Sequence, residues 1–232
     1  MASDIASPRM RFFVLKKLSG GTHDTEFDPT SNNVGPGLQC PQCREPIGML
    51  SWEPPYQGEL ELFGKGFGDL VKLPGGDLLV TEQFAAAFTA EGLTGLSGFH
   101  AVEVLRVIKK RRGPKPGPPP RYLFVIPAYG QPALDQERSR LHTSAPIKCT
   151  WCRDTGVDAI DGLALEDGTW SGEDVFRPRG LSGLILVSER FMRFAQRHAL
   201  SHFTFIPIEK YVWDPLGHFY SWEQRNNPPG ES

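Results

Sequence analysis

The stretches Cys40-Pro41-Gln42-Cys43 and Cys149-Thr150-Trp151-Cys152 contain all four cysteines of this 232-residue chain. A C-x-x-C pair can direct two thiolates at one metal ion, and two such pairs supply the four sulfurs of a tetrahedral zinc site. The spacing therefore predicts that Cys40, Cys43, Cys149 and Cys152 bind one structural Zn²⁺. Such an ion would connect the front of the chain to its second half and close the intervening residues into a loop.

Two other interpretations of the cysteines stay open, a redox dithiol and a pair that binds no metal. A thioredoxin-like site places one C-x-x-C after a strand and at the start of a helix. Pro46 and the turn at 153–156 disfavour a helix after either pair. Because four thiolates complete the coordination of zinc, we expect the ion to stabilise the fold and not to catalyse. Loss of any one cysteine should then destabilise the protein heavily.

A second regularity follows each cysteine pair. Residues 78–84 (LLVTEQF) and 185–191 (ILVSERF) share three apolar residues, a hydroxyl residue, a glutamate, a polar residue and a phenylalanine. An amphipathic run follows each segment and leads into an extended stretch. Thr81 and Ser188 are residue types that favour helix N-caps. Each copy therefore predicts a strand, a helix and a second strand.

These repeats predict an α+β fold, a single pseudo-duplicated domain of two modules. Each module would be a C-x-x-C knuckle followed by strand, helix and strand, and the zinc site would hold the two together. Two copies are too few for a solenoid, which needs at least about three repeats. We expect a flexible leader, one domain and a tail, with boundaries at 1–9, 10–212 and 213–232.

The two halves of the predicted domain, about 10–108 and 122–212, are joined by the basic, proline-rich spacer 109–121. Its prolines exclude a helix interior or a central strand. The spacer could be a nucleic-acid-binding arm or a solvated excursion between the halves. No aromatic residue is interleaved with the basic run, which favours the solvated excursion.

The composition gives no bias toward nucleic acid or an anionic membrane, because the net charge is only −2. No apolar run approaches the roughly 18 residues of a membrane span. The short apolar run at 12–15 is followed by Lys16 and Lys17, which is the wrong order for a signal peptide. We therefore expect a cytoplasmic protein with no membrane partner, where paired cysteines favour metal over disulfide.

The chain becomes acidic after the second cysteine pair. Seven carboxylates and no lysine or arginine fall between Arg153 and Arg177. They are Asp154, Asp158, Asp161, Glu166, Asp167, Glu173 and Asp174. The spacing of a calcium loop is absent. The stretch is either a solvated loop or a recognition surface for a basic partner.

No catalytic arrangement stands out in the sequence. The six histidines are scattered, and we interpret them as surface or helix-end residues. The glycine-rich run at 64–68 lacks the spacing of a phosphate-binding loop. No G-x-S-x-G elbow is present. We predict that the protein is not an enzyme.

The early Cys-Pro-x-Cys, the late Cys-x-x-Cys, the Val-Ser-Glu-Arg-Phe segment and the final Phe-x-Pro-Ile strand resemble the myxobacterial double-CxxCG motif family. The resemblance extends over about residues 10–210. That family includes immunity proteins of swarm-inhibition toxin systems. The resemblance implies a cytoplasmic protein that binds a cognate protein toxin and neutralises it without chemistry.

One departure from the family pattern concerns the residue after each second cysteine. The family has glycine there, whereas this chain has Arg44 and Arg153. Glycine would ease the tight turn around the metal. An alternative function is a zinc-ribbon-like nucleic-acid-binding or regulatory module that uses the spacer 109–121.

Overall fold

The computed structural model describes residues 10–30, 33–48, 50–113 and 116–220. The predicted leader at 1–9 and the end of the predicted tail lie outside these residues. The strands are β1 (Phe12–Lys17), β2 (Thr25–Pro29), β3 (Gln57–Leu62), β4 (Leu70–Lys72), β5 (Leu78–Thr81), β6 (Leu96–Lys109), β7 (Tyr122–Ala133), β8 (Leu141–Thr143), β9 (Val157–Asp161), β10 (Val175–Arg179), β11 (Leu186–Ser188), β12 (Phe203–Pro207) and β13 (Val212–Trp213). The helices are α1 (Glu82–Ala90), α2 (Glu189–Arg197) and the short 3₁₀ helix η1 (Ile208–Lys210).

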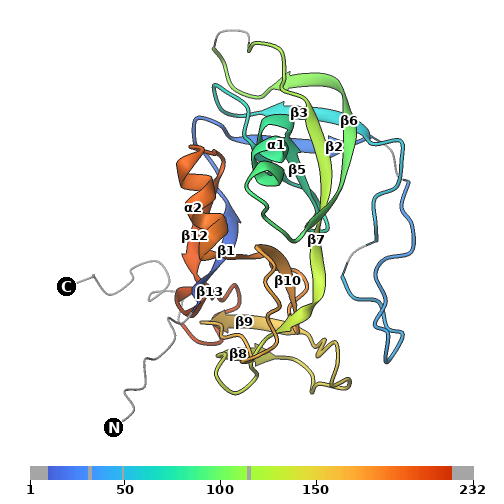
Figure 1. Cartoon of the computed structure of the whole chain (residues 1–232), viewed down its shortest axis with the longest axis vertical. Helices are drawn as coiled ribbons and strands as arrows, with labels where there is room; N and C mark the ends of the chain where they lie inside the picture. Colours follow the sequence, from blue (N-terminus) through green and yellow to red (C-terminus); the bar gives the residue numbers. More distant parts are fainter. Residues whose placement is uncertain (1–9, 31–32, 49, 114–115, 221–232) are drawn as a thin grey trace, which may run out of the picture.

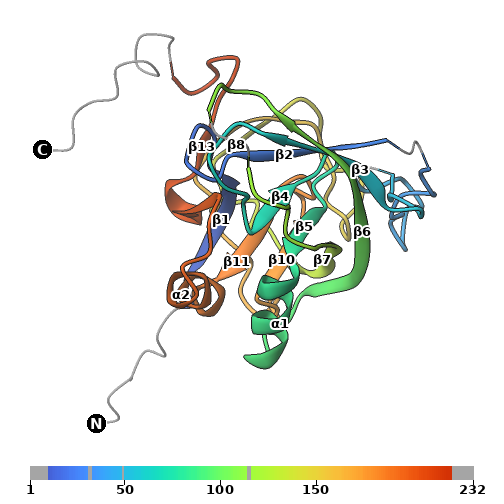
Figure 2. The same ribbon diagram turned by 90° about the horizontal axis from the view of Figure 1, so that it is seen from above.

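The predicted α+β class is wrong, because the fold is mostly β-sheet. A curled, mixed ten-stranded sheet has the order β12-β1-β11-β10-β7-β6-β3-β2, and β4 and β5 join it beside β7. The helices α1 and α2 lie on one side of this sheet (Figure 2). A smaller sheet of order β13-β9-β8 lies at one end of the molecule (Figure 1).

The two predicted modules are not self-contained units either. The strand β1 pairs with β11 and β12, which belong to the second predicted half. Conversely, β7 pairs with β5 and β6, which belong to the first. Strands of both halves are therefore mixed in one continuous sheet, and the sequence repeat does not mark separate folding units.

The predicted starts of both helices are confirmed. Thr81 and Ser188 are the N-caps, and their side-chain oxygens accept hydrogen bonds from the backbone N–H groups of Phe84 and Phe191. These bonds satisfy donors that the first turn of a helix leaves without a partner. The helix α2 ends at Arg197.

The cap of α2 is part of a buried network. The Ser188 hydroxyl also donates to the Asp174 carboxylate at 2.6 Å, whereas the Thr81 hydroxyl lies 3.4 Å from Asp69. Asp174 accepts further hydrogen bonds from the Thr94 backbone N–H and from Arg190, each at 3.0 Å. The α2 cap therefore ties α2 to the residue just before β10 and to the loop after α1.

Ser188→Ala is expected to lower the free energy of unfolding by about 2 kcal/mol, because it removes the cap and a partner of buried Asp174. Thr81→Ala should cost only about 1 kcal/mol, since its second hydrogen bond is longer. Urea unfolding of the two variants measures the difference. Equal losses would show that the Asp174 contact contributes nothing beyond capping.

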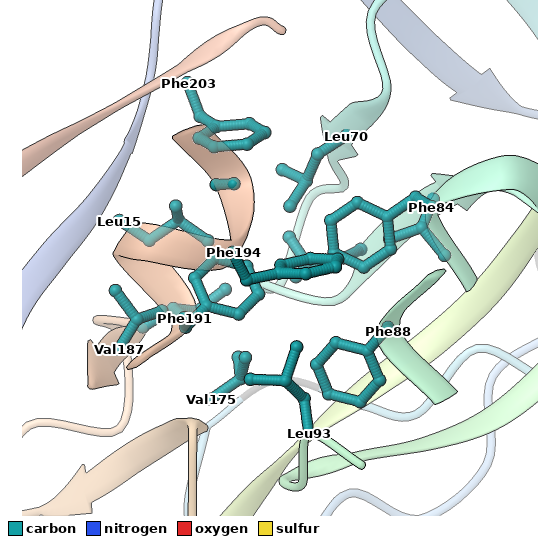
Figure 3. Close-up of a cluster of buried hydrophobic side chains, with 14 of the residues drawn as sticks. Leu15, Leu70, Phe84, Phe88, Leu93, Val175, Val187, Phe191, Phe194 and Phe203 are labelled. Carbon is teal, nitrogen blue, oxygen red and sulfur yellow. The ribbon is translucent and has the colours of Figure 1, made fainter. Parts of the chain in front are cut away.

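The main core lies between the two helices and the sheet. Figure 3 shows Phe84 and Phe88 of α1 facing Phe191 and Phe194 of α2. All four side chains are buried, and the ring centroids of Phe84 and Phe194 lie 5.7 Å apart at right angles. The edge-to-face geometry is one that aromatic pairs prefer. No helix among the described residues is long and apolar enough to cross a membrane.

Candidate metal centre

Each cysteine pair is held in a tight backbone turn. The Arg44 N–H donates to the Cys40 carbonyl at 2.9 Å, and the Arg153 N–H donates to the Cys149 carbonyl at 3.0 Å. The first turn is closed by a bridge between Gln39 and Pro46. Both turns thus present the two sulfurs of a pair on the same side of the chain, as a metal knuckle requires.

The two pairs converge, which confirms that the four cysteines lie close enough to hold one metal ion. The Sγ atoms of Cys40 and Cys149 are 3.8 Å apart, and so are those of Cys43 and Cys152. All four Sγ atoms lie within 4.8 Å of one another. Three of the four residues are buried, and none forms a disulfide.

The surroundings of the cluster favour the thiolate form of Cys40 and Cys149. Burial raises the pKa of the Cys40 thiol, but the backbone N–H groups of Cys43 and Gln42 more than offset it and bring the pKa to about 6. The backbone N–H of Cys152 likewise lowers the pKa of Cys149. The turns therefore stabilise negative charge on the first sulfur of each pair, whereas the pKa values of Cys43 and Cys152 are raised.

Aromatic and apolar side chains close the cluster from solvent. Ile47, Tyr129 and Trp151 pack against the cysteines. The Arg179 guanidinium lies 5.4 Å from the centre of the Trp151 ring and donates to the Trp151 carbonyl at 3.0 Å. Burial raises the pKa of Tyr129, which keeps its phenol neutral beside the sulfurs. A metal ion with four sulfur ligands in this setting would have no position for substrate.

The residues that follow the second cysteine of each pair, Arg44 and Arg153, adopt the backbone conformation that glycine favours. Arg44 has φ 67° and Arg153 has φ 55°, both in the left-handed region. For a residue with a Cβ this conformation costs roughly 1–2 kcal/mol. Both arginines are therefore held in a strained backbone conformation.

Substitution by glycine should change the stability of the protein in opposite directions at Arg44 and at Arg153. Arg44 is exposed, so Arg44→Gly should raise the free energy of unfolding by about 1 kcal/mol. The Arg153 side chain donates to the Leu134 carbonyl at 2.9 Å and pairs with Glu166, so Arg153→Gly should lower it by about 1 kcal/mol. Thermal and urea unfolding measure the stability of both variants. A higher free energy of unfolding for Arg153→Gly would contradict the structural role of the Arg153 side chain.

The seven acidic residues predicted to contact a partner lie in different environments. Asp174 is buried in the α2 cap network. Glu173 accepts a hydrogen bond from Ser171, and Asp158 lies beside His142. Three others form internal ion pairs: Asp161 with Arg140, Glu166 with Arg153, and Asp167 with Arg138. Only Asp154 and Asp167 are exposed, so the charge that this stretch offers to a partner is smaller than its composition suggests.

The structure also gives His202 a role that the sequence does not reveal. His202 is buried, in contrast to the surface or helix-end position predicted for the histidines. Its Nδ1 lies 3.0 Å from the Leu70 carbonyl, and its Nε2 accepts from the Thr25 backbone N–H at 3.2 Å. The same Nε2 also lies 3.3 Å from a carboxylate oxygen of Asp24. No local pattern marks this residue, because its partners are far away in the sequence.

Comparison of the sequence with models of known protein families gives no match, and comparison with curated proteins gives none either. The geometry of the site defines a cysteine cluster suited to a structural metal.

Proposed function

We propose that this chain is an immunity protein that binds and neutralises a cognate protein toxin, and that its four cysteines hold a structural Zn²⁺. The convergence of the two C-x-x-C pairs supports the proposal, since these pairs are the most specific part of the resemblance to the double-CxxCG family. A closed cysteine site supports a binding role, because it offers no position for a reacting group.

The sulfur geometry supports zinc as the bound ion. Tetrahedral zinc with bonds of about 2.3 Å to sulfur places neighbouring sulfurs about 3.8 Å apart. The Cys40–Cys149 and Cys43–Cys152 separations are both 3.8 Å. The all-thiolate donor set also suits zinc. Hard cations such as Mg²⁺ and Ca²⁺ prefer oxygen ligands.

The acidic stretch is the part of the surface that we propose for toxin contact. Asp154 follows the second knuckle directly and is exposed, and Asp167 is exposed in the turn before Trp170. Since the metal site fixes the second knuckle, it would also fix the position of Asp154. A basic toxin surface would be complementary to these carboxylates.

Co-expression with toxin domains of swarm-inhibition systems in a susceptible bacterium tests the function. We expect growth to be restored by one toxin partner and a complex of the two proteins to be isolated by size exclusion. Asp154→Lys with Asp167→Lys should weaken that complex, whereas Glu103→Lys, on the far strand β6, should not. Failure of every toxin to bind would contradict the proposal.

A second candidate function rests on a basic cleft. A cleft of about 580 Å³ is lined by Lys65, Lys109, Arg111 and Arg112 and by the glycine turn at 20–21. No acidic side chain among the described residues pairs with Arg111 or Arg112. The cleft favours an anionic ligand, which would support the alternative of a nucleic-acid-binding module.

Salt dependence separates the two candidate functions. Affinity for a phosphate backbone falls steeply as salt increases, because counterions are released on binding. A fluorescent single-stranded oligonucleotide tests this directly. Salt-sensitive binding that is lost in Arg111→Ala with Arg112→Ala would favour the module, and absence of binding would favour immunity.

A further inference from the structure

A second group of metal-binding side chains lies on the small sheet and is distinct from the four cysteines. It consists of His142 on β8, Asp158 on β9 and His218 in the segment that follows β13. One ligand atom from each residue lies within 4.8 Å of the others. Three separate segments of the chain thus bring two imidazoles and one carboxylate together.

The side chains already contact one another. The rings of His142 and His218 are stacked, with centroids 3.8 Å apart and an angle of 14° between the planes. The Nδ1 atom of His142 lies 3.6 Å from a carboxylate oxygen of Asp158. Imidazole nitrogen and carboxylate oxygen are ligands that Zn²⁺, Co²⁺ and Ni²⁺ accept.

The backbone around His218 is built to hold it in this position. The strand β13 pairs with β9, so the segment starts next to Asp161 and Ile160. The Asp214 carboxylate then accepts hydrogen bonds from four successive backbone N–H groups, at 2.7 to 2.9 Å, including that of His218. The Tyr220 hydroxyl donates to Asp161 and anchors the far side of the turn.

We propose that His142, Asp158 and His218 bind one exchangeable transition-metal ion, which fixes the segment 211–220 on the small sheet. Ligand atoms of a tetrahedral site with bonds of about 2.0–2.1 Å lie about 3.4 Å apart. The ligand atoms must therefore approach more closely, and one imidazole must rotate out of the stack, because an imidazole nitrogen binds a metal in the plane of its ring. The exposed fractions of the His142 and Asp158 side chains, 45% and 31%, leave room for that movement.

The open coordination of this site distinguishes it from the cysteine site. Three protein ligands leave a fourth position for water or for a donor from another molecule. The ion would therefore exchange with solution, whereas an ion held by four cysteines, three of them buried, would not. This inference does not depend on the immunity function.

A titration with Co²⁺ tests the site on the full chain, prepared without a histidine tag and with its cysteine site loaded with zinc. We expect calorimetry to show one further ion per chain, and the Co²⁺ spectrum to lack a thiolate charge-transfer band. His142→Gln and His218→Gln should each weaken binding about tenfold or more. His198→Gln is the matched control, since His198 is also exposed and paired with a carboxylate, that of Glu91.

Hydrogen exchange provides a second readout that simple surface adsorption of Co²⁺ would not change. Bound Co²⁺ should slow exchange of the backbone amides in 211–220 in the natural protein and not in His218→Gln. Circular dichroism verifies that each variant is folded. The proposal is overturned if the natural protein binds no second ion, or if both glutamine variants bind it as tightly as the control.

Discussion

Replacing Cys149 by serine is expected to abolish metal binding and to lower the free energy of unfolding by about 5 kcal/mol. The Cys149 sulfur lies 3.8 Å from that of Cys40, so its loss leaves the ion with three sulfurs and a solvent-accessible gap. Binding of a structural zinc is worth about 10–16 kcal/mol in small metal-dependent domains, and much of it is folding free energy. Domains are stable by only about 5–15 kcal/mol in total.

Elemental analysis and urea unfolding measure the two effects. The natural protein should contain one zinc per chain, and a chelator should lower its melting temperature to that of Cys149→Ser. Thr150→Ser is the control, because Thr150 is exposed within the same knuckle and contributes no sulfur. A natural protein without zinc, with a melting temperature that a chelator leaves unchanged, would refute the metal site and reopen the redox interpretation.

Phe194→Ala is expected to lower the free energy of unfolding by about 3–5 kcal/mol, because the side chain is fully buried and its removal leaves a cavity. Its ring contacts Phe84 and Phe88 of α1 as well as Phe191 of α2. The variant therefore loosens the packing of both helices on the sheet.

Phe219→Ala is the matched control for Phe194→Ala, since the Phe219 side chain is 38% exposed and lies outside this core. Urea unfolding should show little change for that variant. A loss below about 1 kcal/mol for Phe194→Ala would indicate that the neighbouring rings fill the space. Retained zinc in Phe194→Ala would show that the core and the metal site contribute separately.

The features that could be predicted from the sequence depend on local chemistry. Thr81 and Ser188 cap helices because their hydroxyls reach backbone N–H groups three residues away. The convergence of the cysteine pairs follows from what thiolates bind, whatever the fold between them. These inferences did not require knowledge of which strands are neighbours.

The fold class could not be predicted because it depends on distant pairing. The stretch from Pro127 to Lys148 resembles a loop in composition, yet β7 continues through Pro127 and Pro132 to Ala133. Likewise, β2 lies in a glycine-rich region that favours turns, and it forms by pairing with β3. Tertiary pairing overrides local propensity at these positions.

The acidic stretch shows that composition alone does not predict which charges are neutralised in the fold. Composition shows seven carboxylates without a cation among them, but the arginines that neutralise four of them come from outside the stretch or from its edge. The trio of His142, Asp158 and His218 was missed for the same reason. Its members lie in three segments that only the small sheet brings together.

The exchange of β1 and β7 between the halves affects the order of events during synthesis. The strand β1 leaves the ribosome early, but its partners β11 and β12 begin at Leu186 and Phe203. At about 5–20 residues per second, β1 waits roughly 10–30 s for a partner. During that interval its apolar residues and backbone hydrogen-bonding groups are exposed, so the nascent chain should depend on chaperones that bind apolar segments.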